Sequence, residues 1–207
     1  MYTMKVCYII LTCEKFLNTR ASWQKSTFLQ DVDKKDIYFI SGVSSENVYG
    51  WNTPDHYEAC PMKYMMFIKN MDIQYDWYIF IDDDTFMYPS RVRDCLAAFD
   101  ERKKYYIGSE RTEREFVYMS GGAGFCLSNA LYQEIKRYVD DKTLNELYYN
   151  YNGDVTVGYW ISKMNDILYV THPLFSADPP RNEEELKNFI SFHYLKTKED
   201  FERCFLF

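Results

Sequence analysis

The sequence predicts an α/β protein in which a mostly parallel β-sheet carries helices on both faces. This prediction rests on three short runs of apolar, β-forming residues that alternate in the first half with longer segments of helical pattern. Such alternation is typical of parallel sheets, because each crossover helix packs back onto a face of the sheet. The predicted strands of this half are 5–12, 36–41 and 77–81, and the predicted helices are 16–28, 57–71 and 90–99.

The second half of the sequence is less regular. Residues 42–54, which carry Gly, Ser, Asn and Pro, are predicted to be a loop. A chain of 207 residues without an internal repeat fits one domain, 1–207, with two unequal halves that meet near residue 110. After residue 100 the predicted strands are 105–108, 115–119, one that begins at 125, 167–170 and 189–194, and the predicted helices are 129–139, 154–164 and a short one at the C-terminus.

The composition is that of a folded globular protein and argues against nucleic acid as a partner. Hydrophobic residues make up 47% of the chain and charged residues 27%. The net charge is −7, whereas nucleic-acid binding depends on neutralising phosphates with Lys and Arg. A phosphate-bearing ligand stays compatible with this charge, since a bound divalent cation supplies positive charge. The 20 Tyr, 15 Phe and 4 Trp mainly build the core, and some could line a sugar site.

The cysteines and the hydropathy pattern bear on where the protein works. The six cysteines are scattered, with no C-x-x-C pair and no zinc-like spacing. Cys7 and Cys126 lie in apolar, strand-like runs, so we expect reduced, buried thiols at these two positions. No signal peptide precedes the first strand, and no apolar run approaches membrane-spanning length. These features predict a soluble, cytoplasmic protein with no membrane segment in this chain. Domains that follow Phe207 would make it part of a longer multidomain protein.

Polar residues follow several of the predicted strands. In open α/β sheets, ligands bind beyond the carboxyl ends of the strands. The order of elements therefore predicts a ligand site where three polar clusters meet, namely Thr12 with Cys13, Asp82 to Asp84, and Gly121 to Gly124.

The acidic run Asp82-Asp83-Asp84 is the strongest candidate at this edge. Adjacent carboxylates repel one another unless a cation neutralises them, and carboxylate oxygens suit Mg²⁺ or Mn²⁺. In extended backbone Asp82 and Asp84 point to one side, so we expect these two to bind the metal, which would bridge a diphosphate. Asp83 would then face a ribose hydroxyl or a basic side chain. The alternatives are an exposed acidic turn that caps the next helix, or a haloacid-dehalogenase-type phosphatase, whose pattern disagrees with Phe86.

The glycine-rich stretch 120–128 (SGGAGFCLS) is the second candidate. Adjacent glycines permit positive φ and let a ligand approach the backbone closely, which makes Gly121 and Gly122 candidate binding residues. The alternative is a tight hairpin that needs flexible residues.

Taken together in their order along the chain, these motifs resemble those of the Fringe-like and core-1 β1,3-galactosyltransferase-like glycosyltransferases. The stretches GGAGFCLS and DVTVGY, one after the other, are the specific part of the resemblance. The matching pieces cover most of the chain and are Thr12 with Arg20 and Trp23, Lys63, 77–84 (WYIFIDDD), 121–128 (GGAGFCLS), 153–159 (GDVTVGY) and 191–194 (SFHY).

The resemblance implies a GT-A fold, with a central mostly parallel sheet flanked by helices and a smaller acceptor-side sheet. Residues of about 1–110 would bind the nucleotide sugar, and residues of about 111–207 would form the acceptor and catalytic half. In this family the acidic run binds Mn²⁺ and the diphosphate of a UDP-sugar, which implies the same for Asp82 and Asp84, with Mg²⁺ as the alternative ion. The remaining donor-binding residues implied are Thr12, Arg20, Lys63, Asp83, Gly121 and Gly122.

Asp154 matches the position of the general base in inverting members of this family. Such a carboxylate takes the proton of the acceptor hydroxyl as it attacks an oxocarbenium-like centre. The alternative is that Asp154 caps the helix that begins at Val155. The family often has two acidic residues here, whereas this chain has Gly153 before Asp154. This difference leaves the exact position of the base and the type of acceptor open.

A histidine is the expected last metal ligand, because a neutral imidazole completes many carboxylate metal sites. His193, in the matched SFHY segment, is the first choice, and His172 and Asp178 are the alternatives. We expect His56 at the surface and Trp23 in the core.

The predicted function is the transfer of a hexose or deoxyhexose from a UDP-sugar to a hydroxyl of a glycan or glycoprotein, with inversion. The alternatives are a retaining GT-A enzyme and a non-catalytic module that binds carbohydrate or nucleotide sugar, since fold does not decide chemistry. Members of the family are usually lumenal and membrane-anchored, so a trimmed lumenal domain or a virus-encoded protein is the alternative to a cytoplasmic one.

Overall fold

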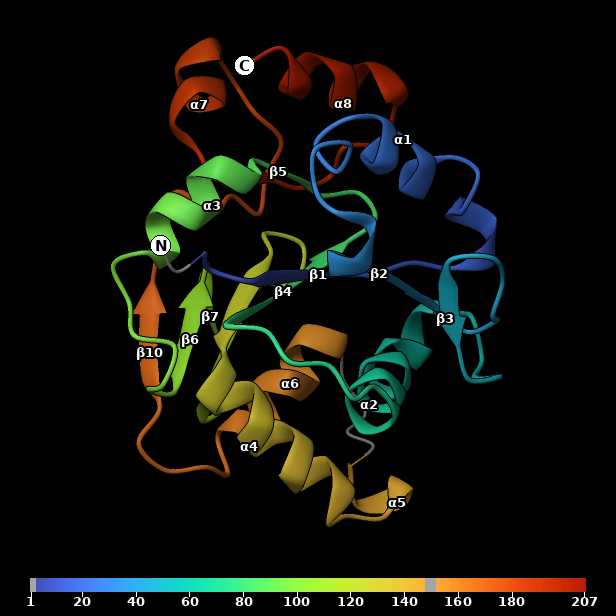
Figure 1. The fold of residues 1–207 in the computed structure, drawn as a ribbon, viewed down its shortest axis with the longest axis vertical. Helices are drawn as coiled ribbons and strands as arrows, with labels where there is room; N and C mark the ends of the chain where they lie inside the picture. Colours follow the sequence, from blue (N-terminus) through green and yellow to red (C-terminus); the bar gives the residue numbers. More distant parts are fainter. Residues whose placement is uncertain (1–2, 148–151) are drawn as a thin grey trace.

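The computed structural model describes residues 3–147 and 152–207. In this described part, a seven-stranded sheet forms the centre, and helices pack against both of its faces (Figure 1). The predicted α/β class and mostly parallel sheet are therefore confirmed. The strand order across the sheet is β10 (Leu168–Thr171), β6 (Tyr105–Gly108), β9 (Phe125–Ser128), β4 (Trp77–Asp82), β1 (Val6–Leu11), β2 (Ile37–Ser41) and β3 (Val48–Gly50).

The pairing of β1, β4 and β9 brings the predicted polar clusters to one edge of the sheet. β1 pairs in parallel with β4, so Leu11 lies beside Asp82 and both strands end together. β9 is antiparallel to β4 and to β6. Because β9 runs opposite to β4, the glycines that precede β9 lie at the edge where the acidic run follows β4.

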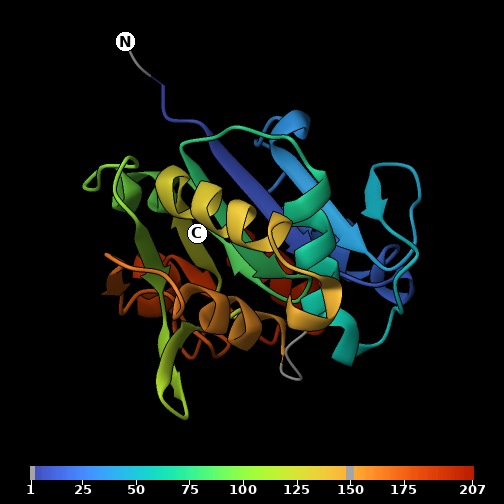
Figure 2. The ribbon, with the colours of Figure 1, turned by 90° about the horizontal axis from the view of Figure 1, so that it is seen from below.

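Each face of the sheet has its own hydrophobic core. Side chains of a strand alternate between the two faces, so Tyr8 of β1 packs in the core on one face and Ile9 in the core on the other. Figures 1 and 2 show the two helical layers on either side of the sheet. One layer contains α1 (Arg20–Ser26), α3 (Pro89–Leu96), α7 (Glu183–Asn188) and α8 (Lys198–Phe205), and the other contains α2 (Cys60–Asn70), α4 (Asn129–Asp140), α5 (Leu144–Leu147) and α6 (Gly153–Ile161).

Two small sheets accompany the central one. β5 (Phe86–Met87) pairs with β11 (Ser191–Phe192) and ties the segment after the acidic run to the C-terminal part of the chain. β7 (Glu110–Glu113) and β8 (Phe116–Met119) form a hairpin beside α6. The expected smaller sheet is thus present as two separate strand pairs in the described residues.

Several boundaries differ from the prediction. The predicted loop 42–54 contains the edge strand β3, which pairs with β2 and is three residues long. So short an edge strand has little apolar pattern of its own. The predicted helix 16–28 is shorter, since α1 begins at Arg20 after a 3-10 turn at Glu14–Phe16, and other 3-10 turns occupy Lys34–Asp36 and Tyr57–Ala59. The predicted strand 189–194 is reduced to β11.

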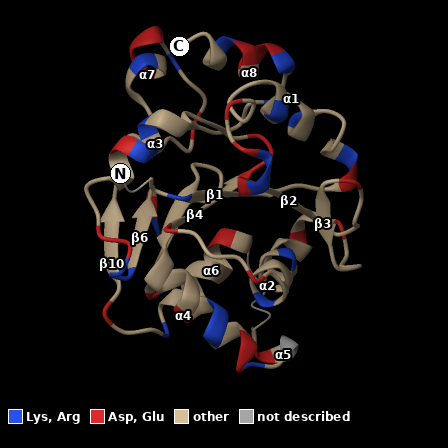
Figure 3. Cartoon of the chain, viewed as in Figure 1, with Lys and Arg blue, Asp and Glu red and all other residues tan. Residues whose placement is uncertain are grey.

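Charged side chains gather on the helices and loops, while the central strands carry few of them (Figure 3). All six cysteines are free thiols. None of the helices built by residues 3–147 and 152–207 is both long and apolar enough to cross a membrane.

Candidate active site

The acidic run lies in a turn that is fixed by side chains from other elements. Asp82 ends β4, and the backbone N–H of Asp83 donates to the carbonyl of Leu11 at 3.0 Å. The buried side-chain amide of Gln24 on α1 donates to the carbonyls of Asp82 and Thr85 at 2.9 and 2.8 Å. The geometry of the acidic turn is therefore set by α1. Gln24, which lies one turn after Arg20 on the same helix, was not among the predicted site residues.

Asp82, Asp84 and His193 form a candidate metal site. One ligand atom of each lies within 4.8 Å of the others. His193 Nε2 is 3.0 Å from Asp84 Oδ1 and 3.9 Å from Asp82 Oδ2. Two carboxylates and one imidazole fit Mn²⁺ or Mg²⁺, because these ions prefer oxygen ligands and accept a nitrogen.

Neither alternative ligand belongs to this group in the described residues. His172 packs its ring edge-on against Phe175, and burial lowers the pKa of its imidazole. The backbone carbonyl of Asp178 accepts a hydrogen bond from the backbone N–H of His193 at 3.3 Å, so it supports the segment that carries His193.

Asp84 is surrounded by basic side chains. Its carboxylate contacts His193, forms an ion pair with Lys196, and lies 3.6 Å from Arg20 NH1. Burial alone would raise the pKa of Asp84, but the hydrogen bonds from His193 and Lys196 lower it to about 2. Asp84 is therefore ionised at neutral pH, as a metal ligand must be.

Asp83 faces the other way and contacts a basic side chain, one of the two environments expected for it. Its carboxylate accepts hydrogen bonds from Thr12 Oγ1 at 2.8 Å and from Arg20 NH1 at 3.1 Å. Burial nevertheless raises the pKa of Asp83. Burial followed by the charges of Asp154 and Asp84 raises the pKa of Asp82 well above its usual range. A bound divalent cation would lower the free-energy cost of ionising both Asp82 and Asp83.

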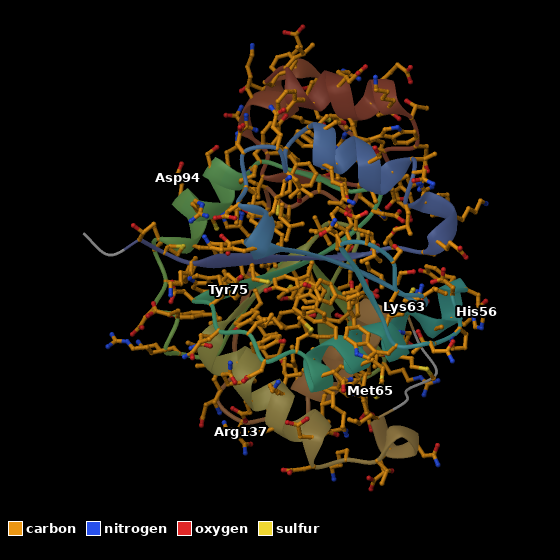
Figure 4. The ribbon with its side chains drawn as sticks, turned by 45° about the vertical axis from the view of Figure 1, so that its right-hand side comes forward. His56, Lys63, Met65, Tyr75, Asp94 and Arg137 are labelled. Atoms are coloured by element: carbon orange, nitrogen blue, oxygen red, sulfur yellow. The ribbon has the colours of Figure 1, made fainter. Side chains whose placement is uncertain are left out.

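Lys63 is buried within the same region but has a different partner. Its ammonium lies 2.6 Å from the carboxylate of Asp55 and donates to the carbonyl of Thr12 at 3.0 Å. Figure 4 shows Lys63 in the interior and His56 at the periphery, in line with the exposed position expected for His56. Asp55 also accepts hydrogen bonds from the backbone N–H groups of Glu14 and Gly42 at 2.7 and 2.8 Å. Asp55 thus joins the loops after β1 and β2, a role that its loop sequence does not signal.

A first cavity of about 330 Å³ opens over this cluster. It contains the candidate metal ligands and the expected donor-binding residues except Gly121 and Gly122, which line a different cavity. The polar residues that line it include Thr12, Arg20, Asp55, Lys63, Asp82, Asp83, Asp84, His193 and Lys196. Trp23 does not line this cavity and packs against the core, as expected.

The glycine turn owes its composition to close contacts with the site. A Cβ atom on Gly122 would lie 2.1–2.5 Å from three atoms of the His193 ring. The Thr85 hydroxyl donates to the carbonyl of Gly122 at 2.7 Å and holds the turn against β4. Gly122 is therefore the residue that leaves room for the histidine beside the acidic run.

Asp154 lies in the first turn of α6, next to the glycine turn. Its carboxylate accepts hydrogen bonds from the backbone N–H groups of Gly121 at 2.7 Å and Val155 at 2.8 Å. The helix begins at Gly153 with Asn152 as its N-cap, so the alternative role considered for Asp154, as the N-cap of a helix that begins at Val155, is wrong. Burial raises the pKa of Asp154, and the two N–H groups oppose this effect.

A second cavity of about 250 Å³ adjoins the first. Asp154, Gly121 and Gly122 line it, and Asp82, His193 and Tyr194 line both cavities. The candidate metal site thus lies at the boundary between two cavities, one rich in charge and one that contains the candidate base.

A model of the Fringe-like family matches residues 3–200. The chain belongs to the Fringe-like family. Two curated relatives carry the name β-1,3-N-acetylglucosaminyltransferase radical fringe. The one from Gallus gallus is 24% identical over 138 residues, which is 52% of this chain and 36% of the relative. The one from Notophthalmus viridescens is 23% identical over 176 residues, 74% of this chain and 43% of the relative. The Fringe-like chain thus spans less than half the length of these relatives.

Solved structures of glycosyltransferases share the fold. A glycosyltransferase involved in glycosylation of the major capsid of PBCV-1 matches with a TM-score of 0.52 and 11% identity, over 97% of this chain and all of the other. The galactosyltransferase LgtC, solved with donor and acceptor sugar analogues, matches with a TM-score of 0.51 and 11% identity, over 95% and 94%. At these identities the likeness shows the fold, which is the predicted GT-A architecture.

Proposed function

We propose that this Fringe-like chain is a metal-dependent glycosyltransferase that moves a sugar from a UDP-sugar to a glycan or glycoprotein hydroxyl with inversion. The observation that carries the proposal is the pair of adjoining cavities that share Asp82 and His193. One cavity offers charges suited to a nucleoside diphosphate, and the other holds a carboxylate suited to a base.

The first cavity would bind the donor. Asp82, Asp84 and His193 would hold Mn²⁺, or Mg²⁺ as the alternative. The ion would stabilise the diphosphate as it leaves. Arg20 and Lys196 carry positive charge at the edge of the same cluster and would pair with phosphate oxygens, while Thr12 and Asp83 would face the nucleoside side of the donor.

The second cavity would bind the acceptor, with Asp154 as the base. As the acceptor oxygen forms its bond to the anomeric carbon, the bond from that carbon to the diphosphate breaks, and Asp154 takes the proton. The backbone N–H groups of Gly121 and Val155 fix the Asp154 carboxylate. Burial keeps its pKa above the ordinary range, which favours proton uptake. In this assignment 1–110 mainly serves the donor and 111–207 the acceptor, although His193 and Lys196 reach back to the donor cavity.

A panel of nucleotide sugars tests the proposal. With Mn²⁺ present, a true donor at 100 times its Kd should stabilise the protein by about 2.7 kcal/mol and raise its Tm, and chelation should abolish the effect. The panel should include UDP-hexoses, UDP-deoxyhexoses and UDP-N-acetylglucosamine, since the relatives' names contain that last sugar. If no nucleotide sugar shifts the Tm, the donor assignment is wrong.

Product analysis separates the remaining alternatives. Transfer with inverted anomeric configuration, read by NMR of the product, supports direct displacement with a base, and retained configuration overturns that mechanism. Binding of a UDP-sugar with no transfer to glycans and no hydrolysis would instead support a non-catalytic module. The cytoplasmic location remains a prediction.

A further inference from the structure

The Tyr64 hydroxyl is a buried polar group without a partner beside the proposed catalytic base. The side chain of Tyr64, on α2, is 1% exposed, and its hydroxyl has no hydrogen-bond partner within residues 3–147 and 152–207. Yet Tyr64 lines the second cavity together with Asp82 and Asp154, and it does not line the first. Most buried hydroxyls are hydrogen-bonded, so this one calls for a physical explanation.

The start of α6 leaves room for the Tyr64 ring. A Cβ atom on Gly153 would lie 2.7 Å from Cε2 and 2.9 Å from Cδ2 of the ring. Gly153 is the residue directly before Asp154, at the start of α6. The ring also packs edge-on against Phe80 of β4 at 5.2 Å between centroids, which fixes its position.

Burial and the nearby carboxylates Asp82 and Asp154 raise the pKa of Tyr64 well above its usual value. The hydroxyl therefore stays protonated and can donate a hydrogen bond. Carboxylates supply acceptors only, so a neutral donor complements them in a cavity that binds a sugar, whose hydroxyls both donate and accept.

We propose that Tyr64 is a positioning residue for the acceptor, whose hydroxyl donates to an oxygen of the acceptor sugar bound beside Asp154. The hydrogen bond would orient the sugar so that its attacking hydroxyl faces the base. This inference rests on the proposed function and adds a specificity-determining contact to it. The acceptor class that fits is a sugar with at least one oxygen besides the hydroxyl that attacks.

Tyr64→Phe tests the inference, with Tyr132→Phe as its matched control. Tyr132 lies in the same hydrophobic core, is fully buried, and also has an unpartnered hydroxyl in the described part of the chain, but it does not line the second cavity. Removing an unpaired buried hydroxyl should leave the Tm unchanged or higher in both variants. Only Tyr64→Phe should raise the acceptor KM, by about tenfold, the factor carried by about 1.4 kcal/mol of binding.

Each other outcome has a definite meaning. An unchanged acceptor KM in Tyr64→Phe, with transfer intact, overturns the inference and leaves the proposed function standing. An equal loss in both variants shows a general packing effect and also overturns it. A weaker UDP-sugar Kd with an unchanged acceptor KM would assign the hydroxyl to the donor instead. If the wild-type protein transfers no sugar, the proposed function fails, and the Tyr64 assignment fails with it.

Discussion

Asp84 in the first cavity and Asp154 in the second lie in opposite electrostatic surroundings. In the first, Asp84 is matched by His193, Lys196 and Arg20, and its pKa falls to about 2. In the second, Asp154 is held by two backbone N–H groups, and burial raises its pKa. Backbone N–H groups fix a carboxylate in space without supplying a mobile positive charge.

This difference corresponds to two chemical tasks. A ligand for a divalent cation must remain ionised, which nearby positive charge ensures. A general base must instead be able to take up a proton, which strong ion pairing would oppose. Asp82 lies at the boundary, with a raised pKa and neighbours in both cavities, so its charge depends most on a bound cation.

The largest expected effect is on Asp154. Asp154→Asn keeps one oxygen to accept a backbone hydrogen bond but removes proton uptake, so kcat should fall by about 10²–10⁴-fold. The Mn²⁺-dependent Tm shift with UDP-sugar should remain, because the donor cavity is untouched. Asp94→Asn, at an exposed position on α3, is the control and should keep full kcat. Full activity in Asp154→Asn would show that Asp154 is not the base.

Substitutions of Asp82 and Asp84 should shift the Tm of the metal-free protein in opposite directions. Loss of a residue that supports a metal ligand typically weakens metal binding by about 10–100-fold. Asp82→Asn and Asp84→Asn each remove a ligand itself, so each should weaken Mn²⁺ binding by more than that. Asp84→Asn should lower the metal-free Tm, because it removes a carboxylate that favourable ion pairs hold ionised. Asp82→Asn should raise it, because it removes a charge that burial and neighbouring carboxylates disfavour. Tm shifts of the same sign would contradict the charge balance described here.

The pH dependence of metal-free stability provides a second measurement of the same contrast. The folded-state pKa of Asp84 is below its unfolded value, so its contribution is present above about pH 4 and is lost as the pH falls towards about 2. The folded-state pKa of Asp82 is raised, so its penalty applies at neutral pH and is relieved on acidification. As the pH falls below neutral, the free energy of unfolding of the metal-free wild-type protein should therefore rise relative to that of Asp82→Asn.

Gly122→Ala should disturb the metal site through His193. The added Cβ would collide with the imidazole ring, so Mn²⁺ affinity should fall by about tenfold. The effect should disappear in a His193→Ala background, as a double-mutant cycle would show. Gly50→Ala, where a Cβ would lie 2.4 Å from the carbonyl carbon of Val43 at the far edge of the sheet, should lower the Tm without changing Mn²⁺ affinity.

The smallest effect is expected at Lys196, whose ammonium competes with a cation for Asp84. Lys196→Met should tighten Mn²⁺ binding by about two- to fivefold, since a partly exposed ion pair is worth about 0.2–1 kcal/mol. Titration of free Mn²⁺ by EPR without nucleotide measures this directly. Lys198→Met, which removes an exposed pair with Glu202, should leave Mn²⁺ affinity unchanged. Weaker binding in Lys196→Met would show that Lys196 supports the metal site.

Elements with a clear apolar pattern of their own could be predicted from the sequence. The apolar strands β1 and β4 and the helix α4 match their predicted ranges to within a residue or two. β3 was not predicted, and the strand predicted at 189–194 was too long, because strands of two or three residues, such as β11 and β3, depend on their pairing partners. The position of Lys63 was expected near the acidic run, but its ion pair with Asp55 depends on how a loop folds back.

The sequence by itself determined the α/β class, the acidic run at the end of a buried strand, and the order of motifs that resembles one enzyme family. These features depend on local pattern and chain order. Only the tertiary structure decided how the charges are distributed, because that depends on contacts between residues far apart in the chain. In the folded chain His193 and Lys196 contact Asp84. Asp83 instead bonds to Thr12 and Arg20. Asp154 and Tyr64, whose hydroxyl is unpaired in the described residues, both line the second cavity. The acidic run is therefore one side of a site whose other sides come from the glycine turn, α2, α6 and the C-terminal segment.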